Sequence, residues 1–177
     1  GCDVIQVVKP GDDASRNAGS LQHKASDREK TLFWLAYNVN KRSITLDIES
    51  TPGKEIFKRL AQKADVVIES FSPGYMASLG LSNEEISKVN PSLVMTSISP
   101  FGQSGPYRDF KASDLTLWCL GGMAYVSGDP DRAPVQVSSP QSYLHGGAAA
   151  AAATFIALYH RELTGEGQWI DVSIQEA

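Results

Sequence analysis

The segment Ser99–Tyr107 has the residue types best suited to contact with a ligand. It follows an apolar run and contains Gly102 and Gly105, and glycines let backbone amides approach a bound group closely. A tight turn that needs Gly and Pro is the other interpretation of the same residues. The segment by itself therefore indicates either a binding loop or a simple turn, and the rest of the chain must decide between the two.

Several common active-site signatures are missing from the sequence. No GxGxxG follows a strand-like run, and GxxxxGK[ST], GxSxG and HExxH do not occur. The histidines, His23, His145 and His160, are scattered, and Cys2 and Cys119 form no CxxC or Cys/His spacing. We therefore predict no nucleotide fingerprint, no disulfide framework and no metal site.

Composition narrows the classes of protein further. The 177 residues are 42% hydrophobic, which suits an ordinary globular domain. A net charge of -4 leaves no excess of Lys and Arg for nucleic acid. The Ala-rich run Gly146–Tyr159 is shorter than the about 18 to 20 apolar residues of a bilayer-spanning helix, so we interpret it as a buried helix and expect no membrane partner. The sparse cysteines suit a reducing, cytoplasmic compartment.

Short apolar runs rich in Val, Ile and Thr predict β-strands. Between them, Thr51 followed by Pro52 predicts a helix reaching about Ala64, and the sequence Ser82–Glu85 is typical of a capping box that begins a helix ending near Lys88. Alternating strands and helices predict an α/β fold with a Rossmann-like parallel sheet covered by helices. The predicted strands are Asp3–Val8, Ser43–Ile48, Asp65–Glu69, Leu93–Ser99 and Trp169–Ile174.

A parallel sheet also predicts where a ligand binds. In open sheets of this kind, ligands lie outside the carboxyl ends of the strands. The segments after Val8, Glu69 and Ser99 are therefore the candidate binding segments.

Read in order, five segments of the chain closely resemble the successive signatures of the class III CoA-transferases, the CaiB/BaiF family. This family includes formyl-CoA transferases, carnitine CoA-transferases and α-methylacyl-CoA racemases. The segments occur at matched spacing over nearly the whole chain: Gly1–Ile5, Asn38–Asp47, Ala64–Gly74, Phe101–Tyr107 and Tyr159–Gln168.

The resemblance implies a fold, a substrate and an assembly. Relatives have a Rossmann-like large domain and a small domain, so residues 1–177 are expected to be a piece of the large domain, incomplete at both ends. Two subunits of such relatives interlock like linked rings. Their substrates are a CoA thioester and an organic acid, and no metal is involved. An aspartate takes up the acyl group as a mixed anhydride, which suits a carboxylate because it is ionised at neutral pH.

Tyr143 takes the place of that aspartate in the alignment with the family. A phenol with an ordinary pKa near ~10 is largely neutral at pH 7 and would form an aryl ester, not an anhydride. The racemases' proton-shuttling histidine aligns with Ser113 and their acidic partner again with Tyr143. His145 points roughly 200° away from Tyr143 around a helix axis, so it is not a direct substitute.

The resemblance also assigns positions that would contact CoA. Phe71 and Leu46 would lie against the adenine, Lys111 near the CoA chain, and Lys9 near the nucleotide phosphates. Gly102 and Gly105 would belong to the binding loop.

Other positions depart from the pattern of formyl-CoA transferase. Glu49 replaces a basic residue, Ser70 replaces an Asn and Ser78 replaces an Arg, which indicates weaker CoA binding or an altered ligand.

Three hypotheses about function follow from these residues. The first is a CoA-transferase that is a divergent member of the family or one subunit of a heteromer, whose partner keeps the aspartate. The second is a non-catalytic CoA-binding or scaffold homologue. The third is an active transferase with a shifted nucleophile.

Overall fold

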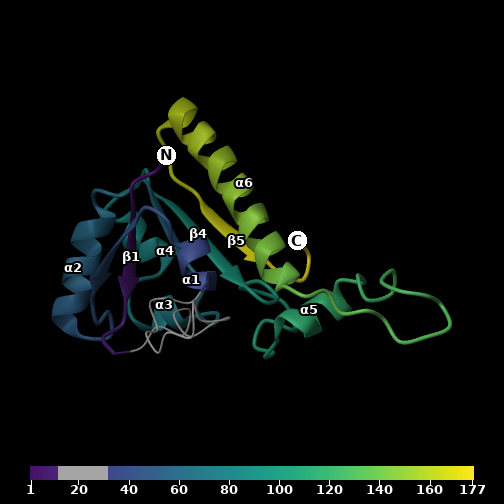
Figure 1. Cartoon of the computed structure of the whole chain (residues 1–177). Coiled ribbons are helices and arrows are strands. Elements are labelled where there is room, and N and C mark those ends of the chain that lie inside the picture. The colour runs from purple at the N-terminus through teal and green to yellow at the C-terminus, as the bar shows by residue number, and fades with distance from the viewer. Residues whose placement is uncertain (12–31) are drawn as a thin grey trace. The chain divides into compact units, whose positions relative to one another are not determined.

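The computed structural model describes residues 1–11 and 32–177 (Figure 1). His23, one of the scattered histidines, lies outside the described residues. The chain forms two compact units, Gly1–Ile56 and Phe57–Ala177. Each unit is described separately below.

The first unit is built on a pair of parallel strands, β1 (Val4–Val8) and β2 (Lys41–Thr45), with α1 (Leu32–Tyr37) before β2. The register pairs Val4 with Lys41 and Val8 with Thr45, and the Leu46 amide then donates to the Val8 carbonyl at 2.9 Å. Parallel strands of this kind need a long connection between them. The pairing therefore confirms the parallel arrangement that the sequence predicts for this part of the chain.

Helix α2 (Thr51–Ala61) begins at the Thr-Pro pair and crosses the boundary between the units. Gly53 in its first turn is required by space, because a Cβ there would lie 1.7 Å from the Asp47 carbonyl oxygen. The helix ends at Ala61, three residues before the predicted end at Ala64. Helix ends are set by local hydrogen bonds that apolar periodicity does not report.

The second unit is built on a parallel sheet with the strand order β3-β4-β5. Its strands are β3 (Val66–Glu69), β4 (Val94–Ser99) and β5 (Trp169–Ser173). All but one of the β4 residues are buried, as expected for a central strand of a parallel sheet. All five predicted strands are present, although β2 covers Lys41–Thr45 and not the predicted Ser43–Ile48. The strands divide into a two-stranded and a three-stranded sheet.

Helix α6 (Gln141–Thr164) packs along β4 and β5 through one face made of small side chains. Thr154 on this face forms a hydrogen bond of 2.8 Å with Thr96 of β4, both hydroxyls being buried. Side chains alternate across a strand, so Met95 and Ser97 point to the opposite face of the sheet. The buried residues of the helix are Ser142, Gly146, Ala150, Thr154 and Ala157.

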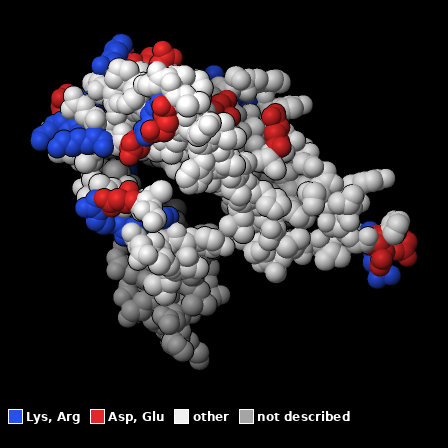
Figure 2. All heavy atoms as spheres, turned by 90° about the horizontal axis from the view of Figure 1, so that it is seen from above, with Lys and Arg blue, Asp and Glu red and all other residues white. Residues whose placement is uncertain are grey.

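The prediction of a buried helix at Gly146–Tyr159 was wrong about its length and about one of its faces. The helix is longer than predicted, and its outer face is exposed, with Ile156 71% and Tyr159 70% accessible. Figure 2 shows a group of charged side chains at the right-hand tip of the view and, beside it, a broad area without Lys, Arg, Asp or Glu. Within the described residues, no helix is both long enough and apolar enough to cross a bilayer.

Three short helices complete the second unit: α3 (Tyr75–Ser78), α4 (Asn83–Ser87) and α5 (Asp114–Leu120). The capping box predicted for α4 is only half formed. The Ser82 hydroxyl accepts the Glu85 amide at 3.4 Å, whereas the Glu85 carboxylate pairs with Lys88. A lysine one turn later competes for the carboxylate, because residues three apart are neighbours on a helix surface.

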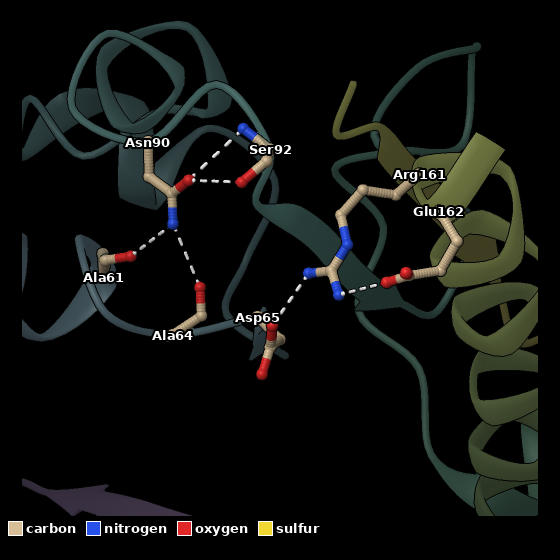
Figure 3. A network of polar contacts seen from close by, with 7 residues as sticks. All are labelled: Ala61, Ala64, Asp65, Asn90, Ser92, Arg161 and Glu162. Carbon is tan, nitrogen blue, oxygen red and sulfur yellow. Dashed lines mark hydrogen bonds and ion pairs between the residues drawn. The ribbon is translucent and has the colours of Figure 1, made fainter. Parts of the chain in front are cut away.

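The amino-terminal edge of the three-stranded sheet is held by a network of polar side chains (Figure 3). The Asn90 side chain donates to the Ala61 and Ala64 carbonyls, both at 3.0 Å, and Arg161 at the end of α6 pairs with Asp65 at 2.9 Å. Partial burial by itself lowers the pKa of Arg161, but hydrogen bonds to Asp65 and Glu162 outweigh it and raise that pKa above its ordinary value. The network fixes α2, β3 and α6 at one edge of the sheet.

Candidate functional site

The carboxyl edge of the three-stranded sheet is where α6 begins. The residues just after β5 lie beside the end of β4, since the Ile174 amide donates to the Ser99 carbonyl at 3.0 Å. Gly146 in α6 lies directly on Ile174, because a Cβ at Gly146 would be 2.9 Å from the Ile174 side chain. Tyr143 precedes Gly146 by about one helical turn, so the structure brings Tyr143 close to the carboxyl edge of the sheet.

Tyr143 is partly open to solvent, with 47% of its surface accessible. Its backbone amide donates to the Asp114 carboxylate at 3.1 Å, and the neighbouring Ser142 hydroxyl donates to the Asp114 carbonyl at 3.0 Å. Asp114 is the first residue of α5, and Figure 1 shows α5 beside the first turn of α6. The side chain at position 143 is therefore accessible and its backbone is fixed.

Ser113, which aligns with the histidine of the racemases, has a structural part in the same junction. Its hydroxyl accepts the Thr116 amide at 3.3 Å, and its own amide donates to the Thr116 hydroxyl at 2.7 Å. This is a reciprocal capping box at the start of α5. Ser113 thus precedes Asp114 in the sequence, and Tyr143 contacts Asp114 through a hydrogen bond. Serine at position 113 offers no group that titrates near neutral pH to move an α-proton.

The loop after β4 is folded back onto the sheet and held by Asp171 of β5. The Gln103 amide donates to both carboxylate oxygens of Asp171, at 3.0 and 2.8 Å. Gly102 has a left-handed φ of 80°, and a Cβ there would lie 3.3 Å from the same carboxylate. Gly105 also has a left-handed φ, of 89°, but open space around it. The glycines therefore satisfy the turn interpretation, and a binding role for the loop stays a prediction.

Aromatic side chains flank this loop. The ring centroids of Tyr107 and Phe110 are 5.2 Å apart, and Phe101 lies 6.0 Å from Tyr107. Tyr107 and Phe110 are 58% and 59% accessible, so an aromatic surface made of rings tilted against one another is open to solvent at this edge. Surfaces of this kind accept planar or apolar parts of a ligand.

The segment after β3 places Phe71 beside Tyr75, with ring centroids 4.8 Å apart. The Phe71 amide donates at 2.8 Å to the carboxylate of Glu69, which is buried. Phe71 itself is 43% accessible, as a side chain that stacks on a purine must be. Its predicted contact with adenine remains untested.

A cavity of about 200 Å³ lies between this segment and the sheet face that carries Met95 and Ser97. A hydrogen bond from Ser82 lowers the pKa of Glu84 at its rim. The sequence analysis did not single out this cavity. Its lining residues are Glu69, Ser72, Gly74, Met76, Ala77, Ser82, Asn83, Glu84, Met95, Ser97, Gln103, Arg108 and Trp169.

The remaining predicted CoA contacts fall in different parts of the chain. Lys111 is exposed in the second unit, between the loop after β4 and α5. Lys9 and Leu46 belong to the first unit, where Lys9 forms an ion pair of 2.9 Å with Glu49. Glu49 is the residue that replaces a basic one in the family pattern. The predicted phosphate-binding lysine therefore already contacts a carboxylate, which fits weaker binding of an anionic nucleotide.

Two functional candidates were missed by the sequence analysis, Asp114 and Asp171. A charged residue inside the apolar run Trp169–Ile174 was the available signal for Asp171. For Asp114, the signal was its place directly after the capping serine. Across residues 1–11 and 32–177, no three His, Cys, Asp or Glu side chains are grouped so as to hold a metal ion.

A parallel sheet covered by helices, with a glycine loop and the start of a long helix at its carboxyl edge, defines an α/β protein. In this class of fold, ligands bind at that edge. Comparison with known proteins identifies the family. The model of CoA-transferase family III matches residues 1–177. The chain belongs to this family, as the sequence signatures predicted.

Three similar proteins illustrate the match. The chain is 40% identical over its full length to the succinyl-CoA:(R)-benzylsuccinate CoA-transferase subunit BbsE of Thauera aromatica, covering 43% of that protein. It is 38% identical over its full length to the succinyl-CoA–L-malate CoA-transferase beta subunit of Chloroflexus aurantiacus, again covering 43%. A CAIB/BAIF family protein from Brucella suis superimposes with a TM-score of 0.89 at 34% identity, over 98% of this chain and 46% of that one. The chain thus spans less than half the length of these relatives.

Proposed function

We propose that the protein binds a CoA thioester and moves CoA from one organic acid to another, as a divergent member of the family or as one subunit of a heteromeric enzyme. Two of the relatives reported above are named as subunits of CoA-transferases, and both names give succinyl-CoA as the donor. Succinyl-CoA is therefore the first donor to test. The acceptor would be a second carboxylic acid.

The observation that carries the proposal is Tyr143 at the accessible start of α6, beside the carboxyl edge of the sheet. In our alignment this is the position of the acyl-accepting aspartate. A neutral phenol is a weak nucleophile and gives an aryl ester that is less reactive than an anhydride. A partner subunit would therefore supply the carboxylate, while this chain would contribute CoA-binding surface and the scaffold of the assembly.

The CoA site that we propose uses the accessible Phe71, the loop with Gly102 and Gly105, and Lys111. Leu46 and Lys9, in the first unit, are two further CoA contacts that the resemblance to the family implies. Apolar flat side chains suit the adenine and ammonium groups suit phosphates. The assembly would be an interlocked homodimer or a heteromer with an aspartate-bearing homologue. We place it in the cytoplasm, since both cysteines of the described structure are free.

The test compares the full-length protein alone with the protein coexpressed with the product of a neighbouring gene that has an aspartate at the matching position. We expect copurification, and transfer from succinyl-CoA to an added acid only by the pair. The matched control replaces the partner's aspartate with asparagine and should abolish transfer without disturbing copurification. Transfer by the full-length protein alone, with the acyl group trapped on one of its own residues, would overturn the proposal.

A further inference from the structure

Helix α6 begins without a capping side chain of its own. The residue before its first turn is Pro140, which makes no side-chain hydrogen bond to the helix. The first amides of an α-helix have no partner within the helix and need one from outside. A helix of 24 residues also concentrates positive partial charge at this end. The first turn of α6 therefore depends on another part of the chain.

Asp114 supplies this partner from α5. Its carboxylate accepts the Tyr143 amide at 3.1 Å, and its main-chain carbonyl accepts the Ser142 hydroxyl at 3.0 Å. Ser142 is 7% accessible, so its hydroxyl needs this acceptor in place of water. One residue thus holds two consecutive positions of α6 across 28 and 29 residues of sequence.

Asp114 is itself held in place. It is the first residue of α5, whose start is closed by the reciprocal capping box of Ser113 and Thr116. A carboxylate that accepts a backbone amide at a helix start makes a charge-assisted hydrogen bond, which is stronger than a neutral one. The junction therefore connects two fixed backbones through one short side chain, and little freedom remains for the turn that carries Tyr143.

We propose that Asp114 is a positioning residue of the acyl site: it caps α6 from outside and thereby fixes the direction in which the side chain at position 143 points. Asp114 acts through the backbone of Tyr143. The capping of α6 by Asp114 is inferred from the two hydrogen bonds, whereas the effect of Asp114 on CoA transfer rests on the proposed function.

The first experiment measures amide hydrogen exchange in the full-length protein and its Asp114→Ala, Asp114→Asn and Asp109→Ala variants. We expect Asp114→Ala to speed exchange at Tyr143 by roughly 10-fold, the scale of a lost cap, and to leave β4 amides unchanged. Asparagine retains an acceptor oxygen, so Asp114→Asn should restore most of the protection. Asp109, an exposed neighbour paired with Arg108, is the matched control. Equal acceleration in β4, or none at Tyr143, would overturn the proposal.

The second experiment uses the Tyr143→Asp background, in which the proposed function predicts that acyl transfer is gained. There, Asp114→Ala should lower kcat by roughly 10-fold and change KM for the CoA thioester by less than about 2-fold, since a misdirected carboxylate affects chemistry more than binding. Asp114→Asn should recover most of kcat. An unchanged kcat in Asp114→Ala would contradict the positioning role. If Tyr143→Asp shows no transfer at all, the proposed function fails, and the exchange data alone decide the role of Asp114.

Discussion

The amino edge and the carboxyl edge of the three-stranded sheet are each stabilised by hydrogen bonds, but the donors and acceptors differ between the two. At the amino edge, side-chain donors meet carbonyls and a carboxylate: Asn90 binds the carbonyls of Ala61 and Ala64, and Arg161 binds Asp65 (Figure 3). At the carboxyl edge, two carboxylate side chains accept backbone amides. Asp171 accepts the Gln103 amide, and Asp114 accepts the Tyr143 amide.

This difference separates a structural edge from an edge suited to a ligand. At the amino edge, the long polar side chains form hydrogen bonds and ion pairs with other groups of the protein. The carboxyl edge fixes backbone by short carboxylates and leaves side chains in solvent, with Tyr107, Phe110 and Tyr143 between 47% and 59% accessible. Substitutions at the amino edge should therefore change stability, and substitutions at the carboxyl edge should change binding and chemistry.

The largest effect is expected at the carboxyl edge from Tyr143→Asp in the full-length protein. The new carboxylate would attack the thioester carbonyl and the C–S bond would break. CoA would leave as its thiolate, and the acyl group would remain on the side chain at position 143 as a mixed anhydride. We expect acyl transfer to rise by at least about 10³-fold, because removal of a nucleophile can cost about 10⁶ in other enzymes. Trapping with hydroxylamine and mass spectrometry should locate a hydroxamate at residue 143. Tyr143→Asn is the control, and equal labelling of the two variants would refute the alignment.

At the amino edge, Gly167→Ala should give the largest loss of stability. A Cβ at Gly167 would lie 2.0 Å from the Leu93 carbonyl oxygen, so backbone must move. We expect a loss of about 3 kcal/mol in the free energy of unfolding, at the upper end for overpacking, measured by denaturant titration. Gly165→Ala is the matched comparison, because Gly165 has a φ of 78° but no atom within 4 Å of its Cβ position; it should cost about 1 kcal/mol. Equal losses in the free energy of unfolding would show that a small backbone shift relieves the contact with Leu93.

Asn90→Ala tests the side-chain donors of the same edge. It removes the side-chain donor to the Ala61 and Ala64 carbonyls, although Ala61 still accepts the Ala64 amide at 3.3 Å. We expect a loss of about 2 kcal/mol with unchanged CoA affinity of the folded protein. Ser92→Ala removes only a hydroxyl that bonds Asn90 at 2.9 Å and should cost less than about 1 kcal/mol. Calorimetry of CoA binding alongside denaturant unfolding separates the two effects. A loss of CoA affinity in Asn90→Ala would erase the distinction between the edges.

A small effect on stability, together with an effect on CoA binding, is expected from Gly102→Ala in the loop after β4. The left-handed φ of 80° costs an alanine about 1 kcal/mol or slightly more. The contact of 3.3 Å with Asp171 would also shift the loop. We expect CoA affinity to fall by roughly 10-fold by calorimetry. Gly105→Ala has a similar φ, of 89°, without the contact, and should change affinity less. An unchanged CoA affinity in both variants would remove the loop from the binding site.

Local sequence patterns were sufficient for much of this fold. Apolar runs located all five strands, and β4 most accurately, because a strand buried on both faces needs a continuous apolar sequence. The Thr-Pro pair located the start of α2, and glycines located the turn after β4. The family signatures predicted the CoA-transferase family, which the comparison confirmed. The outer face of α6 was misjudged, because its alanines and aromatics are apolar on every side and composition does not report which side is covered.

The sequence by itself determined the strands, the glycine turn and the tyrosine at position 143, since these depend on residue type and spacing over a few residues. Only the tertiary structure decided that Asp114 holds the turn of Tyr143 and that Asp171 holds the loop of Gly102. These bonds join residues 29 and 68 positions apart. Their partners are backbone amides, which every residue except proline carries, so no residue type marks them in advance.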